Sequence, residues 1–358
     1  MEFIDLKSQY RIIKNDLNKN INHTLNHNKF ILGPENKILE NKLSNFINSK
    51  YCLTVSSGTD ALLISLMALN IKEGDEVITT SYSYISTIEV IVNLKATPIM
   101  IDINEFDCNL NEDLIEKNIN SKTKAIIAVS LFGQPANLDQ INKIANKYKI
   151  PVIEDSAQSF GSELNNKKSC SLTTIGCTSF FPSKSLSCYG DAGAIFTNSS
   201  YLYKKMKTLR SHGQTKTYHH SFVGISGRMD TIQCSILLSK LKIFKKEISK
   251  RKKIAEIYDE FFDMKKIKRL KVNNNKKSVY SVYPIFIKNR KDCIKKLNKN
   301  KIPFKIYYPM PMNQQKAYKK YSTSIQKVAN KISKQILCIP IHPYLSKNDI
   351  NRIFKIFN

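Results

Sequence analysis

The pattern of hydrophobic and polar positions divides the chain into alternating helical and extended segments. Apolar residues recur with helical spacing over residues 5–29 and 35–48, and the pair Gly33 and Pro34 marks the break between these two predicted helices. From residue 51 onwards, short apolar runs alternate with segments of helical period. The runs predict strands at 51–55, 76–80, 98–102, 125–130, 151–155, 175–181 and 194–197, and the segments between them predict helices at 61–69, 86–94, 112–119 and 138–148.

The predicted strands are almost continuously apolar, as in the run Ala-Ile-Ile-Ala-Val at 125–129. Such strands are typical of a sheet whose two faces are both covered by helices. The sequence therefore predicts an α/β fold with a large, doubly wound sheet that is mixed but mainly parallel. In such a fold, ligands bind at the carboxyl ends of the strands.

A second, smaller α/β pattern occupies the C-terminal part. It follows predicted helices at 201–209 and 229–262, separated by a polar loop at 210–227, and consists of a strand at 280–287 and helices at 292–299 and 324–334. We expect the N-terminal helices and the large domain to comprise residues 1–240, and the small C-terminal domain to comprise residues 241–358.

One stretch of this lysine-rich chain excludes lysine almost completely. The protein has 57 Lys and Arg residues, yet Lys184 and Asp191 are the only charged residues between Ser169 and Tyr203. A run of this kind is buried or sterically constrained, and a desolvated lysine within it has a lowered pKa and is available as a neutral amine. Lys184 is therefore a candidate for Schiff-base chemistry, and the alternative is a lysine that snorkels out of a buried loop.

Two further candidate groups lie at predicted strand ends. Ser57, Gly58 and Thr59 join a strand to a helix, and the free N–H groups at the start of a helix form an anion site. The alternative for this turn is an ordinary Ser or Thr N-cap. Asp155 ends an apolar strand, where a carboxylate needs a cationic partner unless it caps the following segment.

Composition narrows the possible classes of function. The formal net charge is +28, but only seven of the 57 basic residues are Arg, and the Lys residues accompany Asn and Ile throughout the chain. This distribution is typical of a compositional bias, so a regulatory or nucleic-acid-binding protein is only a remote alternative. The eight Cys include no C-x-x-C pair and the six His no zinc-ligand pattern, so we expect reduced thiols and no metal. We also expect a cytoplasmic protein, because no bilayer-spanning run or signal peptide is recognisable.

The candidate groups together match one cofactor. Pyridoxal phosphate needs a lysine for its Schiff base, a carboxylate beside its ring nitrogen, a phosphate site at a helix N-terminus and an aromatic face for stacking. Lys184, Asp155, the turn at 57–59 and Tyr84 supply these four groups within one predicted α/β domain.

At these residues the chain resembles the DegT/DnrJ/EryC1/StrS sugar aminotransferases, a branch of the fold-type I pyridoxal phosphate enzymes. The resemblance covers nearly the whole length, and its most specific part is Phe180-Phe-Pro-Ser-Lys184 followed by Tyr189-Gly-Asp191. The blocks at 211–220 and 339–344 are similar to the aminotransferases that act on UDP-2-acetamido-2-deoxy-3-oxo-glucuronate in bacterial O-antigen synthesis. The resemblance implies amino transfer from L-glutamate, which leaves 2-oxoglutarate, to a UDP-sugar. It further implies a homodimer with shared active sites. From the composition we expect no nucleic-acid or membrane partner.

The resemblance also implies roles for individual residues. Lys184 would form the Schiff base and move the proton, Asp155 would bind the ring nitrogen, and Gln158 would bind the ring hydroxyl. Tyr84 would stack on the ring. The phosphate would be held by Ser57, Gly58, Thr59, Ser179 and, from the neighbouring subunit, Ser226; the sugar nucleotide would be surrounded by Asn28, Phe30, Lys184, Arg228, Tyr307 and Tyr308.

Three positions depart from the family pattern. Ser226 stands where an Asn is common, Ala192 where a Gly is usual, and Tyr307 where relatives often have His. The change at Tyr307 leaves the sugar open, so the main alternative is an aminotransferase for another 3-keto or 4-keto sugar nucleotide. The dehydratase branch of the family replaces the Schiff-base lysine by His, and Lys184 argues against it.

Overall fold

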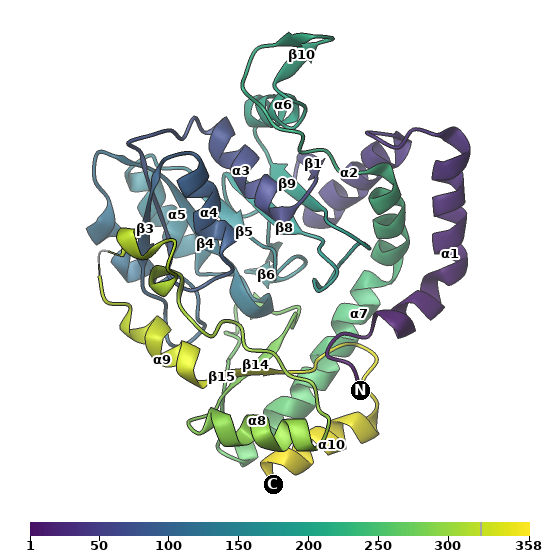
Figure 1. Cartoon of the computed structure of the whole chain (residues 1–358), viewed down its shortest axis with the longest axis vertical. Coiled ribbons are helices and arrows are strands. Elements are labelled where there is room, and N and C mark those ends of the chain that lie inside the picture. Colours follow the sequence, from purple (N-terminus) through teal and green to yellow (C-terminus); the bar gives the residue numbers. More distant parts are fainter. Residues whose placement is uncertain (323) are drawn as a thin grey trace.

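A seven-stranded sheet forms the centre of the larger part of the molecule (Figure 1). The structure is a computed structural model and describes residues 1–322 and 324–358. Neighbouring strands follow the order β1-β9-β8-β5-β4-β2-β3, and every pair is parallel except the two pairs that β9 forms. The strands are β1 (Tyr51–Val55), β2 (Glu76–Thr80), β3 (Thr97–Ile101), β4 (Thr123–Val129), β5 (Val152–Asp155), β8 (Ile175–Ser179) and β9 (Gly193–Thr197). The prediction of a mixed, mainly parallel sheet is confirmed.

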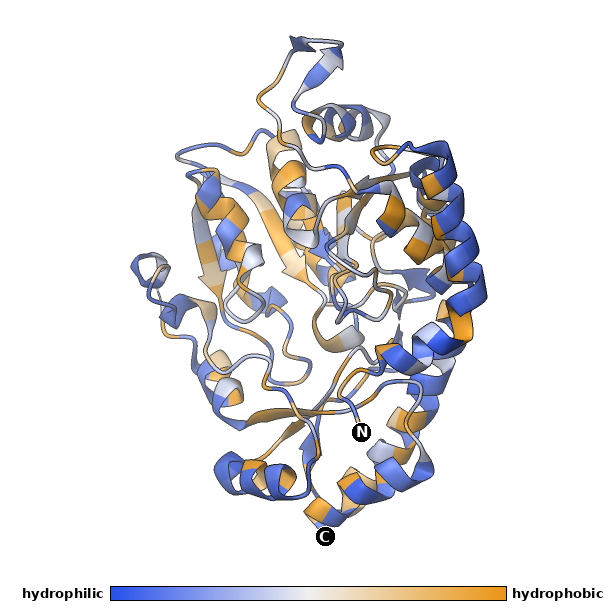
Figure 2. Ribbon diagram, turned by 45° about the vertical axis from the view of Figure 1, so that its right-hand side comes forward, coloured by the Kyte–Doolittle hydropathy of each residue, from blue (hydrophilic) through white to orange (hydrophobic). Residues whose placement is uncertain are grey.

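Helices cover both faces of this sheet, which explains why its strands are apolar on both sides. On one face lie α3 (Gly58–Ala68), α4 (Ser86–Asn93) and α6 (Ser200–Leu209); on the other lie α2 (Pro34–Ile47), α5 (Leu138–Lys147) and the first half of α7 (Thr231–Met264). Coloured by hydropathy, the sheet interior is orange, whereas the outer sides of the helices are blue (Figure 2). The N-terminal helix α1 (Leu6–His27) packs along α7.

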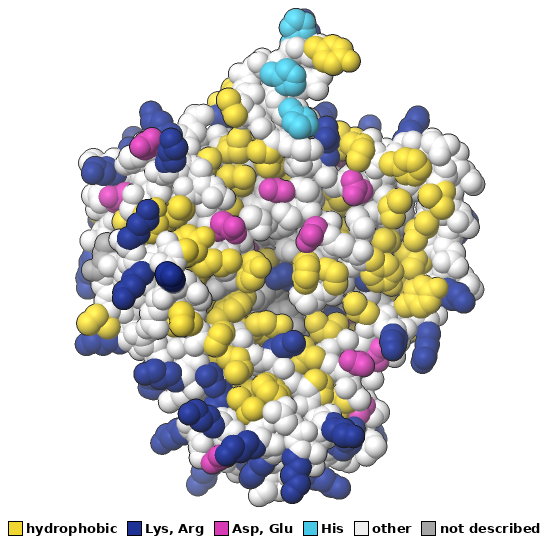
Figure 3. Space-filling view, in the orientation of Figure 1, with side chains coloured by type: hydrophobic (Ala, Val, Ile, Leu, Met, Phe, Trp, Pro, Cys, Tyr) yellow, Lys and Arg dark blue, Asp and Glu magenta, His cyan; other side chains and the backbone are white. Residues whose placement is uncertain are grey.

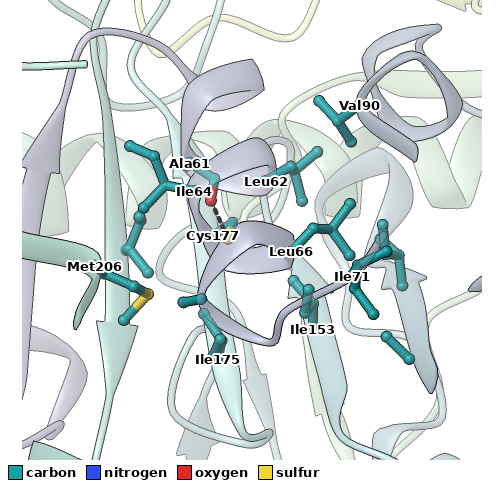
Figure 4. Packing of buried hydrophobic residues seen from close by; sticks show 14 of the residues in the cluster. Ala61, Leu62, Ile64, Leu66, Ile71, Val90, Ile153, Ile175, Cys177 and Met206 are labelled. Atoms are coloured by element: carbon teal, nitrogen blue, oxygen red, sulfur yellow. Dashed lines mark hydrogen bonds between the residues drawn. The ribbon is translucent and has the colours of Figure 1, made fainter. Parts of the chain in front are cut away.

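Helix α3 is packed firmly on the sheet, and its first turn lies at the carboxyl ends of the strands. Ala61, Leu62, Ile64 and Leu66 of this helix pack against the sheet beside Ile153, Ile175 and Cys177 (Figure 4). The Cys177 thiol also donates a hydrogen bond to the Ala61 carbonyl oxygen, at 3.4 Å. These contacts fix the start of α3 relative to β5 and β8.

The smaller part of the molecule is built on an antiparallel sheet of order β12-β14-β15. It comprises β12 (Lys268–Arg269), β14 (Tyr283–Phe286), β15 (Ile336–Ile339), α8 (Arg290–Lys299), α9 (Lys327–Gln335) and α10 (Lys347–Phe357). Helix α7 continues without a break through the predicted domain boundary at residue 240, so the boundary stays a prediction. No helix in the described part of the chain is long and apolar enough to cross a membrane.

The helix predicted at 112–119 is wrong. The structure has two 3-10 turns there, η1 (Glu112–Leu114) and η2 (Glu116–Asn118). Only Ile115 is fully buried in this segment, so it lacks the apolar face that stabilises a short α-helix. The Asn111 side chain also accepts a hydrogen bond from the Asp113 N–H, which favours a tight turn.

The sequence analysis also did not predict the strand β15, the helix α10 and several short strands. The polar loop predicted at 210–227 contains a projecting hairpin of β10 (Gln214–Lys216) and β11 (His219–His220), at the top of Figure 1. A small sheet of order β13-β6-β7 joins β13 (Lys276–Lys277) to β6 (Glu163–Leu164) and β7 (Lys167–Lys168). These strands are too short to leave a periodic signal in the sequence.

Candidate active site

A cavity of about 820 Å³ opens at the carboxyl ends of the central strands. It is lined by the ends of β5 and β8, the first turn of α3, and residues 305–308 of the smaller part of the molecule. On the face that Figure 3 shows, Asp and Glu side chains lie near the centre, whereas Lys and Arg lie mainly at the periphery. Another hollow, of about 740 Å³ beside Glu105 and Lys268, contains none of the predicted site residues.

Asp155 is the last residue of β5 and is 6% exposed. Its carboxylate accepts hydrogen bonds from the Ala157 N–H at 3.1 Å and from the Thr87 hydroxyl at 3.2 Å. Desolvation by burial raises the pKa of Asp155, and the nearby Lys184 charge opposes this shift. Two buried ion pairs elsewhere join Arg210 to Glu40 and Lys276 to Asp107, and Asp155 belongs to neither. The carboxylate is thus buried at a cavity wall with room for a cationic ligand.

Lys184 lies in the loop after β8 and borders the same cavity. Its backbone is held in a turn, because the Lys184 N–H donates to the Phe181 carbonyl at 2.8 Å. Desolvation lowers the pKa of the Lys184 amine, and the Asp155 carboxylate opposes this shift. The structure therefore brings together the two residues that the sequence singled out separately, an amine and a carboxylate with altered pKa values in one cavity.

The first turn of α3 forms a compact cradle with β8 and β9. A Cβ atom added to Gly58 would lie 2.7 Å from the Ser179 Cβ, and one added to Gly193 would lie 2.5 Å from the Ser57 carbonyl oxygen. Only glycine allows these backbones to approach so closely. Ser57, Gly58, Thr59 and Ser179 all line the cavity. The first N–H groups of α3 have no partner within the helix and are oriented for an anion.

Both interpretations of Ser57 have support. Its hydroxyl accepts a hydrogen bond from the Asp60 N–H at 3.0 Å and thereby caps α3. The same residue lines the cavity beside Gly58. Capping fixes the helix start, and the anion site follows from the N–H groups that the cap leaves free.

Aromatic side chains close the opposite wall. Tyr84 is 58% exposed, and its ring centroid lies 6.4 Å from that of Tyr308. The Gln158 amide donates to the Tyr308 hydroxyl at 3.0 Å and accepts from the Phe132 N–H at 3.0 Å. Tyr307 borders the cavity as well. These residues are thus placed where a flat ring could be held, and their individual roles stay predictions.

Four predicted site residues do not line this cavity: Asn28, Phe30, Ser226 and Arg228. Asn28 ends α1 with a positive φ of 59°, and Phe30 is 41% exposed in the following loop. The Arg228 side chain is partly exposed, and its guanidinium donates to the Ser226 hydroxyl at 2.7 Å.

Two residues that complete the site, Thr87 and Tyr82, were given no role from the sequence. Thr87 holds Asp155, and Tyr82 anchors the loop that carries Tyr308. The Tyr82 hydroxyl donates to the Tyr308 carbonyl at 2.8 Å and accepts from the Tyr308 N–H at 2.6 Å. Tyr82 lies two residues after the end of β2, so its place near a strand end was a usable signal, but its partner lies 226 residues away.

A histidine cluster at the junction of α1 and α2 was also unexpected. His23 Nδ1 lies 2.8 Å and His27 Nε2 lies 3.0 Å from the same Glu35 oxygen, and this set of side chains has the composition of a metal site. The three groups satisfy one another by hydrogen bonds, however, and this accounts for their arrangement without an ion. The spacing of four residues between the histidines could be read from the sequence, whereas the identity of Glu35 as their shared partner could not.

The chain is similar to known proteins over nearly its whole length. The profile of the DegT/DnrJ/EryC1/StrS aminotransferase family matches residues 11–358. A UDP-2-acetamido-2-deoxy-3-oxo-D-glucuronate aminotransferase from Pseudomonas aeruginosa is 45% identical over 353 residues, which cover 99% of this chain and 98% of that protein. A DegT DnrJ EryC1 StrS aminotransferase from Brucella abortus superposes with a TM-score of 0.97 at 35% identity, covering 100% of this chain and 98% of that one.

A further match concerns the cofactor. NtdA from Bacillus subtilis, solved with bound cofactor PMP, is 28% identical and has a TM-score of 0.91, covering 99% of this chain and 82% of that chain. The cavity, its amine and carboxylate, and the full-length matches agree with one another. The chain belongs to the DegT/DnrJ/EryC1/StrS family and is a pyridoxal phosphate-dependent sugar-nucleotide aminotransferase.

Proposed function

We propose that this enzyme transfers the amino group of L-glutamate to UDP-2-acetamido-2-deoxy-3-oxo-glucuronate in the synthesis of a surface polysaccharide such as the O-antigen. The observation that carries the proposal is the 45% identity, over nearly the full length of both chains, to an aminotransferase named for that substrate. The donor becomes 2-oxoglutarate, and the 3-keto group of the sugar becomes an amine. Another 3-keto or 4-keto sugar nucleotide is the alternative, because Tyr307 departs from the family pattern.

The residues of the cavity fit pyridoxal phosphate. Asp155 is a buried carboxylate outside the buried ion pairs, and a protonated ring nitrogen supplies the missing cation. The close approach of Gly58 to Ser179 leaves a cradle of small residues and free N–H groups for a phosphate. When bound, the cofactor supplies an electrophilic carbon and an electron sink.

We assign a separate role to each of the cavity residues. Lys184 would hold the cofactor covalently and would move a proton as a general base and acid. Its lowered pKa favours the neutral amine that both tasks need. Asp155 would keep the ring nitrogen protonated, and Gln158 and Tyr308 would orient the ring. Tyr84 would cover the ring and limit the access of water.

The four residues outside the cavity support a shared site in a homodimer. Phe30 is exposed and Arg228 is partly exposed, and neither lines the cavity of its own chain. We infer that Arg228 enters the site of the neighbouring subunit. A mixture of inactive Lys184→Ala and Arg228→Ala chains, refolded together, is expected to regain part of the activity, because one hybrid site carries neither lesion. No recovery in such heterodimers would contradict the shared site.

The substrate is tested by an amine-transfer assay with a panel of 3-keto and 4-keto sugar nucleotides, with and without a 6-carboxylate. We expect the 3-keto uronate to be the best acceptor. Arg228→Lys is expected to lower its kcat/KM by about ten- to a hundredfold, since a lysine cannot pair with a carboxylate through two bonds. A sugar with a 6-hydroxymethyl group should lose little. Equal losses on both sugars would place Arg228 at the pyrophosphate, and a better 4-keto substrate would overturn the proposal.

A further inference from the structure

Lys240 is a buried cation that no part of the proposed reaction uses. It lies in α7 and is 1% exposed. Burial lowers the pKa of its ammonium to about 8, while Cys188 and Glu247 oppose this shift. A buried charge is costly unless it is paired, so its position requires an explanation.

Two other buried cations have conventional partners. Arg210 pairs with Glu40 at 3.0 Å, and Lys276 pairs with Asp107 at 3.1 Å. Lys240 instead donates to the Ser187 hydroxyl at 3.3 Å. Its Nζ also lies 4.1 Å from the centroid of the Tyr189 ring, within the range of a cation–π interaction.

Both contacts of Lys240 fall on residues 184–191, which form the second part of the loop between β8 and β9 and are called the 184–191 loop below. A second residue of α7 holds the same loop, because the Gln233 amide oxygen accepts a hydrogen bond from the Tyr189 N–H at 3.0 Å. The Cys188 N–H donates to the Phe180 carbonyl at 2.7 Å and closes the base of the loop. The loop is therefore fixed at its base and along the side that faces α7.

We propose that Lys240 is a positioning residue, which holds the 184–191 loop against α7 and thereby fixes the Lys184 amine in the cavity. This inference rests on the assignment of Lys184 in the proposed function. An ammonium suits the task because it binds the Ser187 hydroxyl and the Tyr189 ring at once, which an apolar side chain of the same length cannot do. A small displacement of a proton-transfer group lowers its rate strongly without weakening substrate binding.

The test compares Lys240→Met with Lys246→Met, the same change at an exposed position of the same helix. The first readout is the rate at which L-glutamate bleaches the visible band of the holoenzyme, expressed per bound cofactor. We expect Lys240→Met to slow this step about ten- to a hundredfold, with the glutamate concentration at half-maximal rate unchanged within about twofold. Lys246→Met should match the wild type.

A second readout does not depend on turnover. The rate at which the apoenzyme captures free pyridoxal phosphate reports how well Lys184 is placed, and it should fall about tenfold in Lys240→Met. Tyr189→Leu should give a defect in the same direction, and the double variant should be no slower than Lys240→Met alone, because the lysine change already removes the contact with the Tyr189 ring. Unchanged rates per bound cofactor and unchanged capture, with only a lower melting temperature, would overturn the proposal. If glutamate fails to bleach even the wild type, the glutamate assignment fails, and the capture rates alone decide the role of Lys240.

Discussion

Glu154 and Asp155 are adjacent carboxylates at the end of β5, and their surroundings differ. The protein encloses Glu154, whereas Asp155 borders the cavity. Glu154 lies in a closed polar region and is 0% exposed. It accepts hydrogen bonds from the Ser130 hydroxyl at 2.7 Å, the Ser156 hydroxyl at 3.1 Å and the Cys170 N–H at 2.6 Å. Both of its oxygens are therefore satisfied within the protein.

Asp155, the next residue, points to the open cavity. Among the described residues, its carboxylate accepts hydrogen bonds from the Ala157 N–H and the Thr87 hydroxyl, and Lys184 is its charged neighbour. Burial raises the pKa of both carboxyls. We propose that these two adjacent buried acids serve stability and chemistry respectively, because Asp155 borders the cavity where a ligand can bind and Glu154 does not. Changes in the two regions should therefore have opposite effects.

The largest effect on activity is expected when the amine of Lys184, which borders the same cavity as Asp155, is removed. Lys184→Ala should abolish turnover, because it removes both the covalent attachment and the proton carrier. The apoprotein should still fold, because Asp155 keeps its hydrogen bonds from the Ala157 N–H and the Thr87 hydroxyl. Amine-transfer assays and urea titrations measure the two quantities, and normal transamination by this variant would refute the site.

Asp155→Asn should produce the second largest effect. A neutral amide cannot keep the ring nitrogen protonated, so we expect kcat to fall by about 10²–10³-fold, the scale of losing one preorganised electrostatic contact. The folded state should persist, since the amide can still accept one hydrogen bond. Wild-type rates would show that Asp155 merely caps the segment that begins at Ser156.

A change at Glu154, in the closed polar region, should instead lower stability and leave activity nearly unchanged. Glu154→Gln turns an acceptor facing the Cys170 N–H into a donor or leaves one hydroxyl unpaired, so the free energy of unfolding should fall by about 1–3 kcal/mol. Activity per folded molecule should stay within about threefold, because Asp155 keeps its own donors. Glu260→Gln, an exposed change on α7, is the control and should alter stability by less than about 0.5 kcal/mol. A large loss of kcat without a loss of stability in Glu154→Gln would contradict the division of roles between the two acids.

The smallest effect concerns pH. A carboxyl whose pKa is raised in the folded state binds more protons when folded, so its contribution to stability is full at low pH and is lost as the pH rises through the raised value. The apoprotein should therefore lose stability above about pH 4, where unfolded carboxyls ionise. Urea midpoints at several pH values should show a shallower decline in both Glu154→Gln and Asp155→Asn. In the holoenzyme, only Glu154→Gln should flatten the curve, because the ring cation keeps Asp155 ionised.

The sequence alone predicted the mixed, mainly parallel sheet, and it singled out Lys184 and Asp155, which the structure places at one cavity. The apolar runs predicted the strands of the large sheet, since an element buried on both faces must be apolar throughout. The exclusion of lysine around Lys184 and the place of Asp155 at a strand end can both be read from the local sequence. The two residues were expected to lie close together because the carboxyl ends of parallel strands meet at one edge of a sheet. The prediction was wrong at 112–119, where too little surface is buried to enforce a helix, and it left out β15 and α10.

The tertiary structure alone decided which partners these residues have. Thr87 bonds Asp155 across 68 residues, Lys240 reaches Ser187 across 53, and Tyr82 holds Tyr308 across 226. A sequence pattern assigns a residue to a face or an end of an element, but the choice of partner depends on how distant elements pack and on which donors remain unpaired. For the same reason the sequence does not distinguish Glu154 from Asp155, which are neighbours of like chemistry. Only the folded chain encloses Glu154 in hydrogen bonds and places Asp155 at the cavity.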